Sequence, residues 1–233
     1  CEGEGVFNSV TIHCYNSTVH GEEDLADSLA FSCNTSFSNI GTSLDMDKFH
    51  SLCEDFLFNK SLPYGGVYKQ SSFVLDGNSD PSQIPQTVIG QGDTLISPLH
   101  NAMIMATVAN GGVMMKPYIV DSIQNYEGVN VKRFSPSAYK RLMSAQEAQE
   151  LTELLEGVVD YGTGYGVNTE AYSVAGKTGT AEYNAEGQSH SWFVGFSNVE
   201  NPDIVVCVVI EEADVSGVRA TSVARQIFDA YYQ

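Results

Sequence analysis

The sequence predicts an α+β protein in which an antiparallel sheet carries a C-terminal helix and a helical lobe precedes the sheet. Three strand-like segments follow one another with short connections, which favour antiparallel pairing. These segments are residues 172–183, 191–196 and 204–210. Residues 218–231 then repeat apolar side chains at helical spacing. We expect one partial domain over residues 1–233, with a helical lobe at about 22–110 and a sheet lobe at about 113–233.

Composition excludes several classes of partner. The 233 residues are 42% hydrophobic, enough for one sizeable core, and the formal net charge is −18. So acidic a chain with few and scattered Lys and Arg residues is not expected to bind nucleic acid or an anionic membrane. No apolar run approaches the roughly 20 residues of a membrane span, and no signal peptide opens the chain. The chain begins abruptly at Cys1, so we interpret it as a fragment.

The five cysteines do not form a recognisable framework. Their number is odd and they include no C-x-x-C pair, so neither a disulfide framework nor a zinc knuckle is indicated. A Cys1–Cys14 pair stays open, and Cys53 and Cys207 are expected to be buried thiols. We predict no metal ion and no other cofactor, and His20 is expected to hydrogen-bond rather than to ligate.

The first helical segment is expected to break. A short strand is predicted at 10–12, and the acidic residues 22–24 suit the first turn of a helix. Apolar residues then recur every four positions at Leu25, Leu29, Cys33 and Phe37. Ser32 and Asn34 would point about 200° apart in a regular helix. If both serve one site, one helix ends near Phe31 and another covers about 35–43.

The next elements follow from caps and periodicity. Residues 45–58 form a helix with an apolar face of Met46, Phe49, Leu52, Cys53 and Phe56. Residues 59–86 form a long loop. Ser97 and Pro98 start a helix that ends at Asn110-Gly111-Gly112.

The remaining elements complete the sheet lobe. Two short strands flank residues 125–128, and Ser144 with Glu147 forms a capping box for a helix that ends near Gly162. The continuous apolar run 204–210 should be covered on both faces. The last helix should place inward the residues Val223, Ala224, Ile227, Phe228 and Tyr231.

One strand has the composition of an anion-binding edge. It carries the sequence Ala175-Gly176-Lys177-Thr178-Gly179-Thr180-Ala181. Glycine permits close approach to the backbone, threonine hydroxyls donate hydrogen bonds, and the lysine supplies positive charge. This edge is therefore predicted to bind a peptide that bears a carboxylate.

Together these motifs resemble a known family. Lys177-Thr178-Gly179 and Ser32-Cys33-Asn34 match the K-T-G and S-x-N motifs of penicillin-binding proteins and serine β-lactamases. The chain most resembles the transpeptidase domain of class B, high-molecular-mass penicillin-binding proteins. Further similar segments fall in the family's order and cover nearly the whole chain: His20-Gly21, Ile89–Gly92, Ser97-Pro98, Ala109–Gly112, Gly162–Gly164 and Ser191–Phe196.

The resemblance implies a β-lactamase/transpeptidase-like fold that is truncated at its N-terminus, and it implies roles for individual residues. Ser32 would relay protons and Asn34 would hydrogen-bond the substrate backbone. Lys177 would supply positive potential, while the Thr178 and Thr180 hydroxyls beside Gly179 would hold the substrate carboxylate. The Thr180 N–H would be one of two oxyanion donors. Trp192 either packs in the core or lines the site.

The third motif of the family, S-x-x-K, is matched by spacing only at Ser137–Lys140, in a polar stretch after Ser32. We expect that segment to be a solvated turn and the acylating serine to lie upstream of Cys1. The chain would then be an inactive portion of a D,D-transpeptidase that cross-links peptidoglycan stem peptides through an acyl-enzyme and binds β-lactams. Alternatives are a non-catalytic stem-peptide-binding or scaffold homologue, or a relative of the serine β-lactamases.

The resemblance also implies a setting. The parent protein would be anchored to the membrane, act on its extracytoplasmic face and work with other wall-synthesis proteins. Without the strands that the family places before this segment, the strand 204–210 would have an unpaired edge. We expect an isolated chain to be marginally stable or to self-associate.

Overall fold

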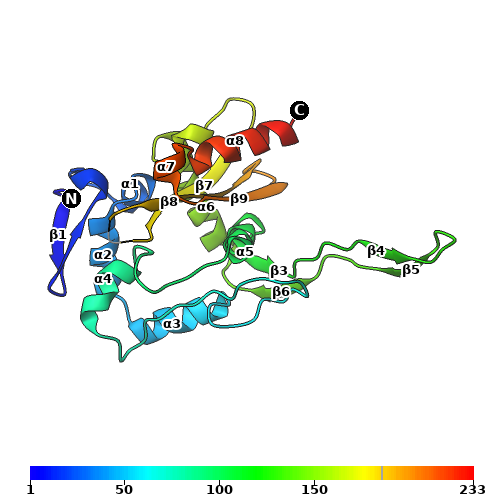
Figure 1. The fold of residues 1–233 in the computed structure, drawn as a ribbon, viewed down its shortest axis with the longest axis horizontal. Coiled ribbons are helices and arrows are strands. Elements are labelled where there is room, and N and C mark those ends of the chain that lie inside the picture. Colours follow the sequence, from blue (N-terminus) through cyan, green and yellow to red (C-terminus); the bar gives the residue numbers. More distant parts are fainter. Residues whose placement is uncertain (185) are drawn as a thin grey trace.

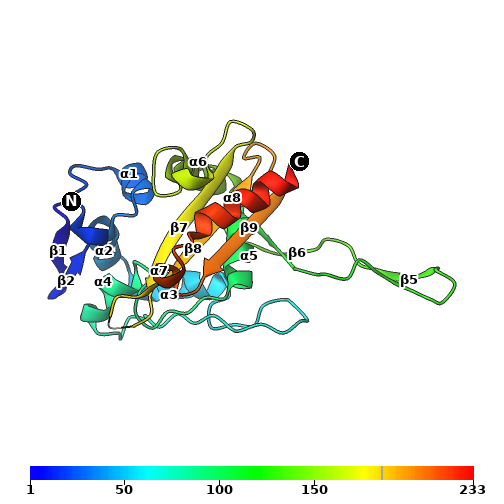
Figure 2. The ribbon, with the colours of Figure 1, turned by 45° about the horizontal axis from the view of Figure 1, so that its top comes forward.

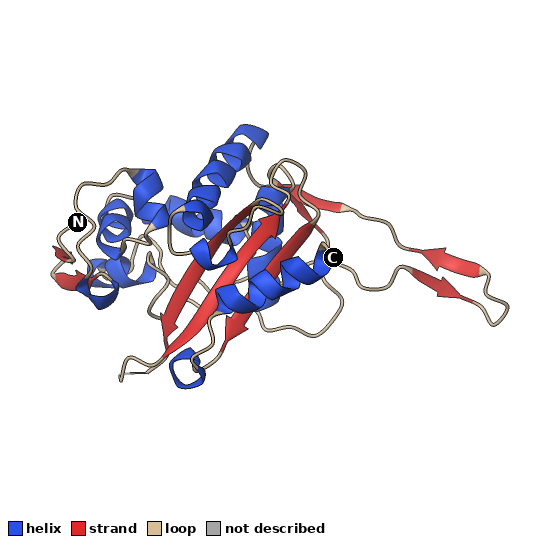
Figure 3. Ribbon diagram, turned by 90° about the horizontal axis from the view of Figure 1, so that it is seen from above, coloured by secondary structure: helices blue, strands red, loops and turns tan. Residues whose placement is uncertain are grey.

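The structure is a computed structural model that describes residues 1–184 and 186–233. At its centre lies a three-stranded antiparallel sheet in the order β7–β8–β9 (Figures 2 and 3). The strands are Val174–Glu182, Ser189–Ser197 and Ile204–Ile210. The three predicted strands and their antiparallel pairing are confirmed, and the fold class is α+β.

Side chains on these strands alternate between two hydrophobic cores, one on each face of the sheet. Helix α8 (Ala220–Tyr231) covers one face, and Phe193 points into the core beneath it. Helices α5 (Pro98–Ala109) and α6 (Ala145–Asp160) cover the other face, and the next residue, Val194, packs there. Strand β9 contributes to both cores, which confirms that its apolar run is covered on both faces.

The other helices of the chain are short. They are α1 (Leu25–Ala30), α2 (Asn34–Thr42), α3 (Met46–Asp55), α4 (Ile84–Thr87) and α7 (Ala213–Ser216). Single turns of 3-10 helix occupy 15–17, 81–83 and 165–167. The gap between α1 and α2 confirms the predicted break around Ser32. None of the helices in the described ranges has the length and apolar character needed to span a bilayer.

Side-chain caps define where several helices begin. Asp24, Asp45 and Ser97 each accept a hydrogen bond from a backbone N–H in the first turn of α1, α3 and α5. The capping box of α6 is confirmed: Glu147 N donates to Ser144 Oγ at 3.1 Å, and Ser144 N donates to Glu147 Oε2 at 2.7 Å.

Three small two-stranded sheets lie outside the central one (Figure 1). The hairpin β4 (Ser122–Gln124) and β5 (Asn130–Arg133) projects far from the body of the molecule, and it confirms the two strands predicted there. At its base, β3 (Val113–Met115) pairs with β6 (Ala138–Arg141). In the third sheet, β1 (Glu4–Phe7) pairs with β2 (Val10–His13).

Some predicted burial is wrong. Leu25, Leu52, Ile227 and Tyr231 are exposed, by 54%, 48%, 39% and 51%. Neighbouring elements cover only part of the apolar face of each of these helices. Residues at the border of that face therefore stay in contact with solvent.

Two further expectations need correction. The loop predicted over 59–86 ends early, because α4 begins at Ile84. Cys53 and Cys207 are half-buried rather than fully buried. Desolvation nevertheless raises the pKa of each thiol to about 11.

Candidate active site

The junction between α1 and α2 exposes a serine on a sharp turn. After α1 ends at Ala30, Ser32 adopts a φ of +56°, in the left-handed region, and α2 begins at Asn34. A non-glycine residue in that region costs about 1–2 kcal/mol. The conformation is held by backbone bonds on both sides of it, from Ser32 N to Leu29 O and from Cys33 N to Ser28 O. Cys33 is fully buried.

Lysine 177 reaches this junction from strand β7. Its Nζ donates to Ser32 Oγ at 2.9 Å and to the Thr178 carbonyl at 3.0 Å. Although the residue retains some exposure, its ammonium group is largely withdrawn from water, and that desolvation lowers the lysine pKa from 10.5 to about 8. Two residues that lie 145 positions apart in the sequence therefore form one hydrogen-bonded pair.

The glycines of β7 serve packing as well as access. A methyl group at Gly176 would lie 2.7 Å from the Phe193 ring and 2.8 Å from the Val194 carbonyl oxygen, so only glycine fits there. At Gly179 the added carbon would lie 3.2 Å from Trp192 Cβ, directly across the β7–β8 pair. Trp192 is half-buried and stands beside the strand that carries Lys177.

Asparagine 34 is oriented by the N-terminal hairpin. Its Nδ2 donates to the His13 carbonyl at 2.9 Å, at the end of β2. That bond uses one of the two Nδ2 hydrogens, so Asn34 can still offer its amide oxygen and its second N–H to a ligand. Asn34 lies two residues from Ser32, which contacts Lys177, while none of the contacts described for Asn34 is to Lys177 itself.

A threonine that the sequence did not single out connects α1 to β7. Thr163 donates its backbone N–H to the Ala30 carbonyl at 2.9 Å, and its hydroxyl lies 2.6 Å from the Thr178 hydroxyl. A methyl group at Gly162 would clash with the Ala30 carbonyl oxygen, so this turn packs closely against the end of α1. The segment Gly162–Gly164 thus carries a residue that contacts Thr178 of the K-T-G strand.

The outer edge of β7 presents its backbone to the site. The Thr178 carbonyl accepts from Lys177 Nζ, and the Thr180 carbonyl accepts from Gln91 Nε2 at 3.4 Å. These carbonyls therefore face away from β8. Because a strand residue points its N–H and its C=O to the same side, the N–H groups of Thr178 and Thr180 also face that edge. Gln91, another residue that sequence reasoning did not assign, lies beside them.

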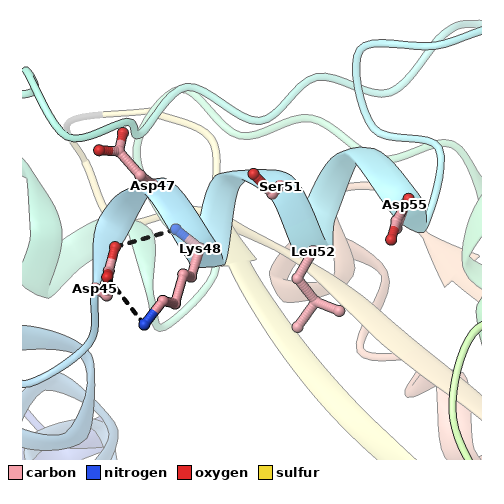
Figure 4. Close-up of a pocket in the computed structure, with 6 residues that line it drawn as sticks. All are labelled: Asp45, Asp47, Lys48, Ser51, Leu52 and Asp55. Carbon is pink, nitrogen blue, oxygen red and sulfur yellow. Dashed lines mark hydrogen bonds and ion pairs between the residues drawn. The ribbon is translucent and has the colours of Figure 1, made fainter.

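The S-x-x-K sequence lies elsewhere. The segment Ser137–Lys140 is solvent-exposed as expected, but it is not a turn, because Ala138–Arg141 form strand β6 paired with β3. Lys140 forms an ion pair with Asp55 at 2.6 Å at the end of α3. A shallow depression along α3 is lined by acidic side chains and Lys48, and it contains none of the predicted site residues (Figure 4). Within residues 1–184 and 186–233, no S-x-x-K serine contacts Ser32 or Lys177.

Two features define the class of this protein. A C-terminal helix packs on an antiparallel sheet, and a lysine on that sheet is hydrogen-bonded to a serine between two helices. Together they define a transpeptidase-like protein of the penicillin-recognising class. A family model described as the penicillin binding protein transpeptidase domain matches residues 3–231. The chain belongs to that family, and its relatives are class B penicillin-binding proteins.

Individual relatives agree with this assignment. The peptidoglycan D,D-transpeptidase PbpA of Mycobacterium tuberculosis is 30% identical over 230 residues, which cover 94% of this chain and 46% of that protein. The D,D-transpeptidase domain of a peptidoglycan glycosyltransferase from Eggerthella lenta superposes with a TM-score of 0.88 at 30% identity, over 98% of this chain and 57% of that one.

An acylated relative is also similar. Penicillin-binding protein A of M. tuberculosis, solved as an imipenem acyl-enzyme complex, superposes with a TM-score of 0.86 at 29% identity, over 97% of this chain and 52% of that one. The chain thus spans about half the length of each of these three relatives.

Proposed function

We propose that this chain forms the S-x-N and K-T-G half of a peptidoglycan D,D-transpeptidase active site. The observation that carries the proposal is the 2.9 Å hydrogen bond between Lys177 Nζ and Ser32 Oγ. It joins the two motifs in the way that proton relay to a substrate requires. The relatives support the same reaction class, since PbpA is a D,D-transpeptidase and penicillin-binding protein A forms acyl-enzymes with β-lactams.

The reaction assigns different tasks to the two residues of the pair. A serine of an S-x-x-K motif, outside these 233 residues, attacks the carbonyl of a D-alanyl-D-alanine bond and forms an acyl-enzyme. Ser32 passes a proton toward the leaving amine, and an amine of a second stem peptide then accepts the acyl group. With a pKa of about 8, Lys177 is protonated in about nine of ten molecules at pH 7, so it orients the Ser32 hydroxyl as a donor and supplies positive potential.

Substrate binding falls to the edge of β7 and to Asn34. The hydroxyls of Thr178 and Thr180 bind the substrate carboxylate, beside the bare backbone of Gly179. The N–H of Thr180, which faces that edge, is one oxyanion donor; loss of such a donor typically costs about 10²–10³ in rate. Asn34 accepts a hydrogen bond from the substrate backbone, and Trp192 borders the groove.

One observation favours a second candidate, a non-catalytic homologue that binds stem peptides or β-lactams. Lys140 of the S-x-x-K in this chain pairs with Asp55, and among the described residues neither Ser137 nor Lys140 contacts a member of the site. A binding protein would use Lys177, Thr178 and Thr180 for the carboxylate and form no acyl-enzyme. A serine β-lactamase is disfavoured by the long segments 59–86 and 114–143.

The relatives also suggest where the protein works. We place the parent on the extracytoplasmic face of the bacterial membrane, held there by an anchor outside this chain, with peptidoglycan stem peptides and wall-synthesis proteins as partners.

A labelling experiment tests the proposal. The 233-residue chain is treated with a fluorescent penicillin beside a version extended at its N-terminus to include an S-x-x-K. We expect a single covalent adduct on the extended protein, by intact mass, and none on the chain alone. Lys177→Ala in the extended protein should reduce the acylation rate by at least tenfold, while Lys140→Ala should leave it unchanged.

Two outcomes contradict parts of the proposal. Labelling of the short chain would mean that Ser32 or Ser137 acts as a nucleophile. An extended protein that has no S-x-x-K, or that binds penicillin without forming an adduct, would favour the non-catalytic homologue.

A further inference from the structure

Four potential metal ligands converge near the N-terminus although they are dispersed in the sequence. The Sγ atoms of Cys1, Cys14 and Cys33 and the ring nitrogen of His20 all lie within 4.8 Å of one another. Cys1 Sγ is 3.6 Å from Cys14 Sγ and 3.4 Å from His20 Nδ1, and Cys14 Sγ is 3.8 Å from Cys33 Sγ. The site just described uses none of these side chains.

Three of the ligand separations match those expected around one tetrahedral ion, and the others stay within 4.8 Å. Zinc binds thiolate at about 2.3 Å and imidazole at about 2.0–2.1 Å, so tetrahedral angles separate two sulfurs by about 3.8 Å and a sulfur from a nitrogen by about 3.5 Å. A disulfide would require about 2.05 Å between two sulfurs. The three thiols are free in the structure, and the Cys1–Cys14 and Cys14–Cys33 separations are those of sulfurs that share a metal ion.

The surroundings of the cluster favour a cation. Cys14 and Cys33 are buried, and the His20 side chain is 12% exposed. Beside them lies Glu23, whose side chain is 3% exposed and whose carboxylate has no hydrogen-bond partner among the described residues, although Oε1 lies 3.5 Å from His20 Nδ1. A buried carboxylate without a hydrogen bond is costly, and no Lys or Arg in the described ranges forms an ion pair with it.

Neighbouring groups also suit thiolate ligands. Cys33 is the N-cap residue of the nine-residue helix α2, where backbone N–H groups favour a negative charge. The Thr35 hydroxyl lies 3.3 Å from Cys33 Sγ and 3.8 Å from Cys14 Sγ, within reach of both sulfurs as an outer hydrogen-bond donor.

We propose that Cys1, Cys14, His20 and Cys33 bind a structural zinc ion. All four positions of a tetrahedral ion are then occupied by protein, which is the arrangement of a structural rather than a catalytic site. The set lacks the C-x-x-C spacing by which zinc sites are recognised in a sequence, so only the fold brings it together.

Such an ion would stabilise the junction that carries Ser32. Cys33 lies between Ser32 and Asn34, whereas Cys14 follows strand β2 directly. The ion therefore ties the β1–β2 hairpin to the start of α2, next to the hydrogen bond from Asn34 to His13 O. Its role is to hold the left-handed turn at Ser32, and it takes no part in bond making.

Metal content tests the proposal directly. The chain is produced in zinc-supplemented medium with a tag that contains no histidine, kept reduced, desalted, and analysed by mass spectrometry for metals. We expect about one zinc per chain, and at least a tenfold loss in Cys14→Ser and His20→Ala. Cys53→Ser is the matched control, because it removes a half-buried thiol outside the cluster and should retain the zinc.

A second measurement does not depend on whether the variants fold. Replacement of zinc by Co²⁺ in the wild-type chain should give the intense visible bands of tetrahedral cobalt and a thiolate-to-cobalt charge-transfer band. Chelation under reducing conditions should lower the melting temperature of the wild type and of Cys53→Ser.

Three results would overturn the proposal. The first is a reduced wild-type chain that binds no stoichiometric zinc and shows no cobalt–thiolate band. The second is a Cys1–Cys14 disulfide that persists in zinc-replete, reducing conditions. The third is zinc retained in both Cys14→Ser and His20→Ala.

Discussion

Because the ammonium of Lys177 is desolvated, we predict that Lys177→Met, which we expect to slow acylation, stabilises the fold at neutral pH. The pKa falls from 10.5 in the unfolded chain to about 8 in the native state. Burial of the charge therefore costs about 3 kcal/mol at pH 7. Lys177→Met removes that cost and also removes the hydrogen bonds to Ser32 and the Thr178 carbonyl, worth about 1 kcal/mol each. We expect a net stabilisation of about 1 kcal/mol at pH 7.

The sign of the stability change caused by Lys177→Met should reverse with pH, which gives a second test. Between pH 8 and 10.5 the unfolded chain holds a proton on Lys177 that the native state has lost, so the contribution of this residue to wild-type stability rises with pH. At pH 10 the remaining cost is about 1 kcal/mol, smaller than the lost hydrogen bonds. Lys177→Met should then be less stable than the wild type by about 1 kcal/mol.

The assay is urea unfolding of the wild type and Lys177→Met at pH 7 and at pH 10. At each pH the free energy of unfolding of the wild type is subtracted from that of the variant, so that the contributions of other titrating groups cancel. Lys140→Met is the control, since its surface ion pair with Asp55 is worth no more than about 1 kcal/mol and should show no reversal. If Lys177→Met destabilises the chain equally at both pH values, the lysine is not desolvated and the reasoning fails.

Three further predictions concern the site, the core and the sheet edge. Thr163→Val removes the hydroxyl bridge to Thr178 and should slow penicillin acylation of the N-terminally extended protein by about tenfold with little change in melting temperature; an unchanged rate would exclude this role. Phe228→Ala, at a fully buried position beneath the sheet, should cost about 3–5 kcal/mol in urea unfolding, whereas Ile227→Ala, on the exposed side of the same helix, should cost under about 1 kcal/mol, and similar values would contradict the assigned helix face. Strand β9 pairs only with β8 in the described ranges, so the isolated chain should self-associate through residues 204–210 in sedimentation analysis; a monomer with a high melting temperature would refute this.

Local sequence determined most of the secondary structure because the relevant interactions span only a few residues. The capping box at Ser144 and Glu147 and the N-cap at Ser97 predict helix starts that the structure reproduces. The apolar run of β9 predicts a strand covered on both faces, since period and length suffice for that inference. The motifs around Ser32 and Lys177 likewise indicate the family without any coordinates.

Other features depend on how elements meet, which a single sequence does not reveal. Ile227 continues the apolar stripe of α8, but the width of the sheet beneath the helix decides that it is exposed. The thiols of Cys1, Cys14 and Cys33 converge with His20 only because a hairpin packs against the start of α2. The lowered pKa of Lys177 is likewise a tertiary property, because it comes from burial of an ammonium whose hydrogen-bond partner Ser32 lies 145 positions away in the sequence.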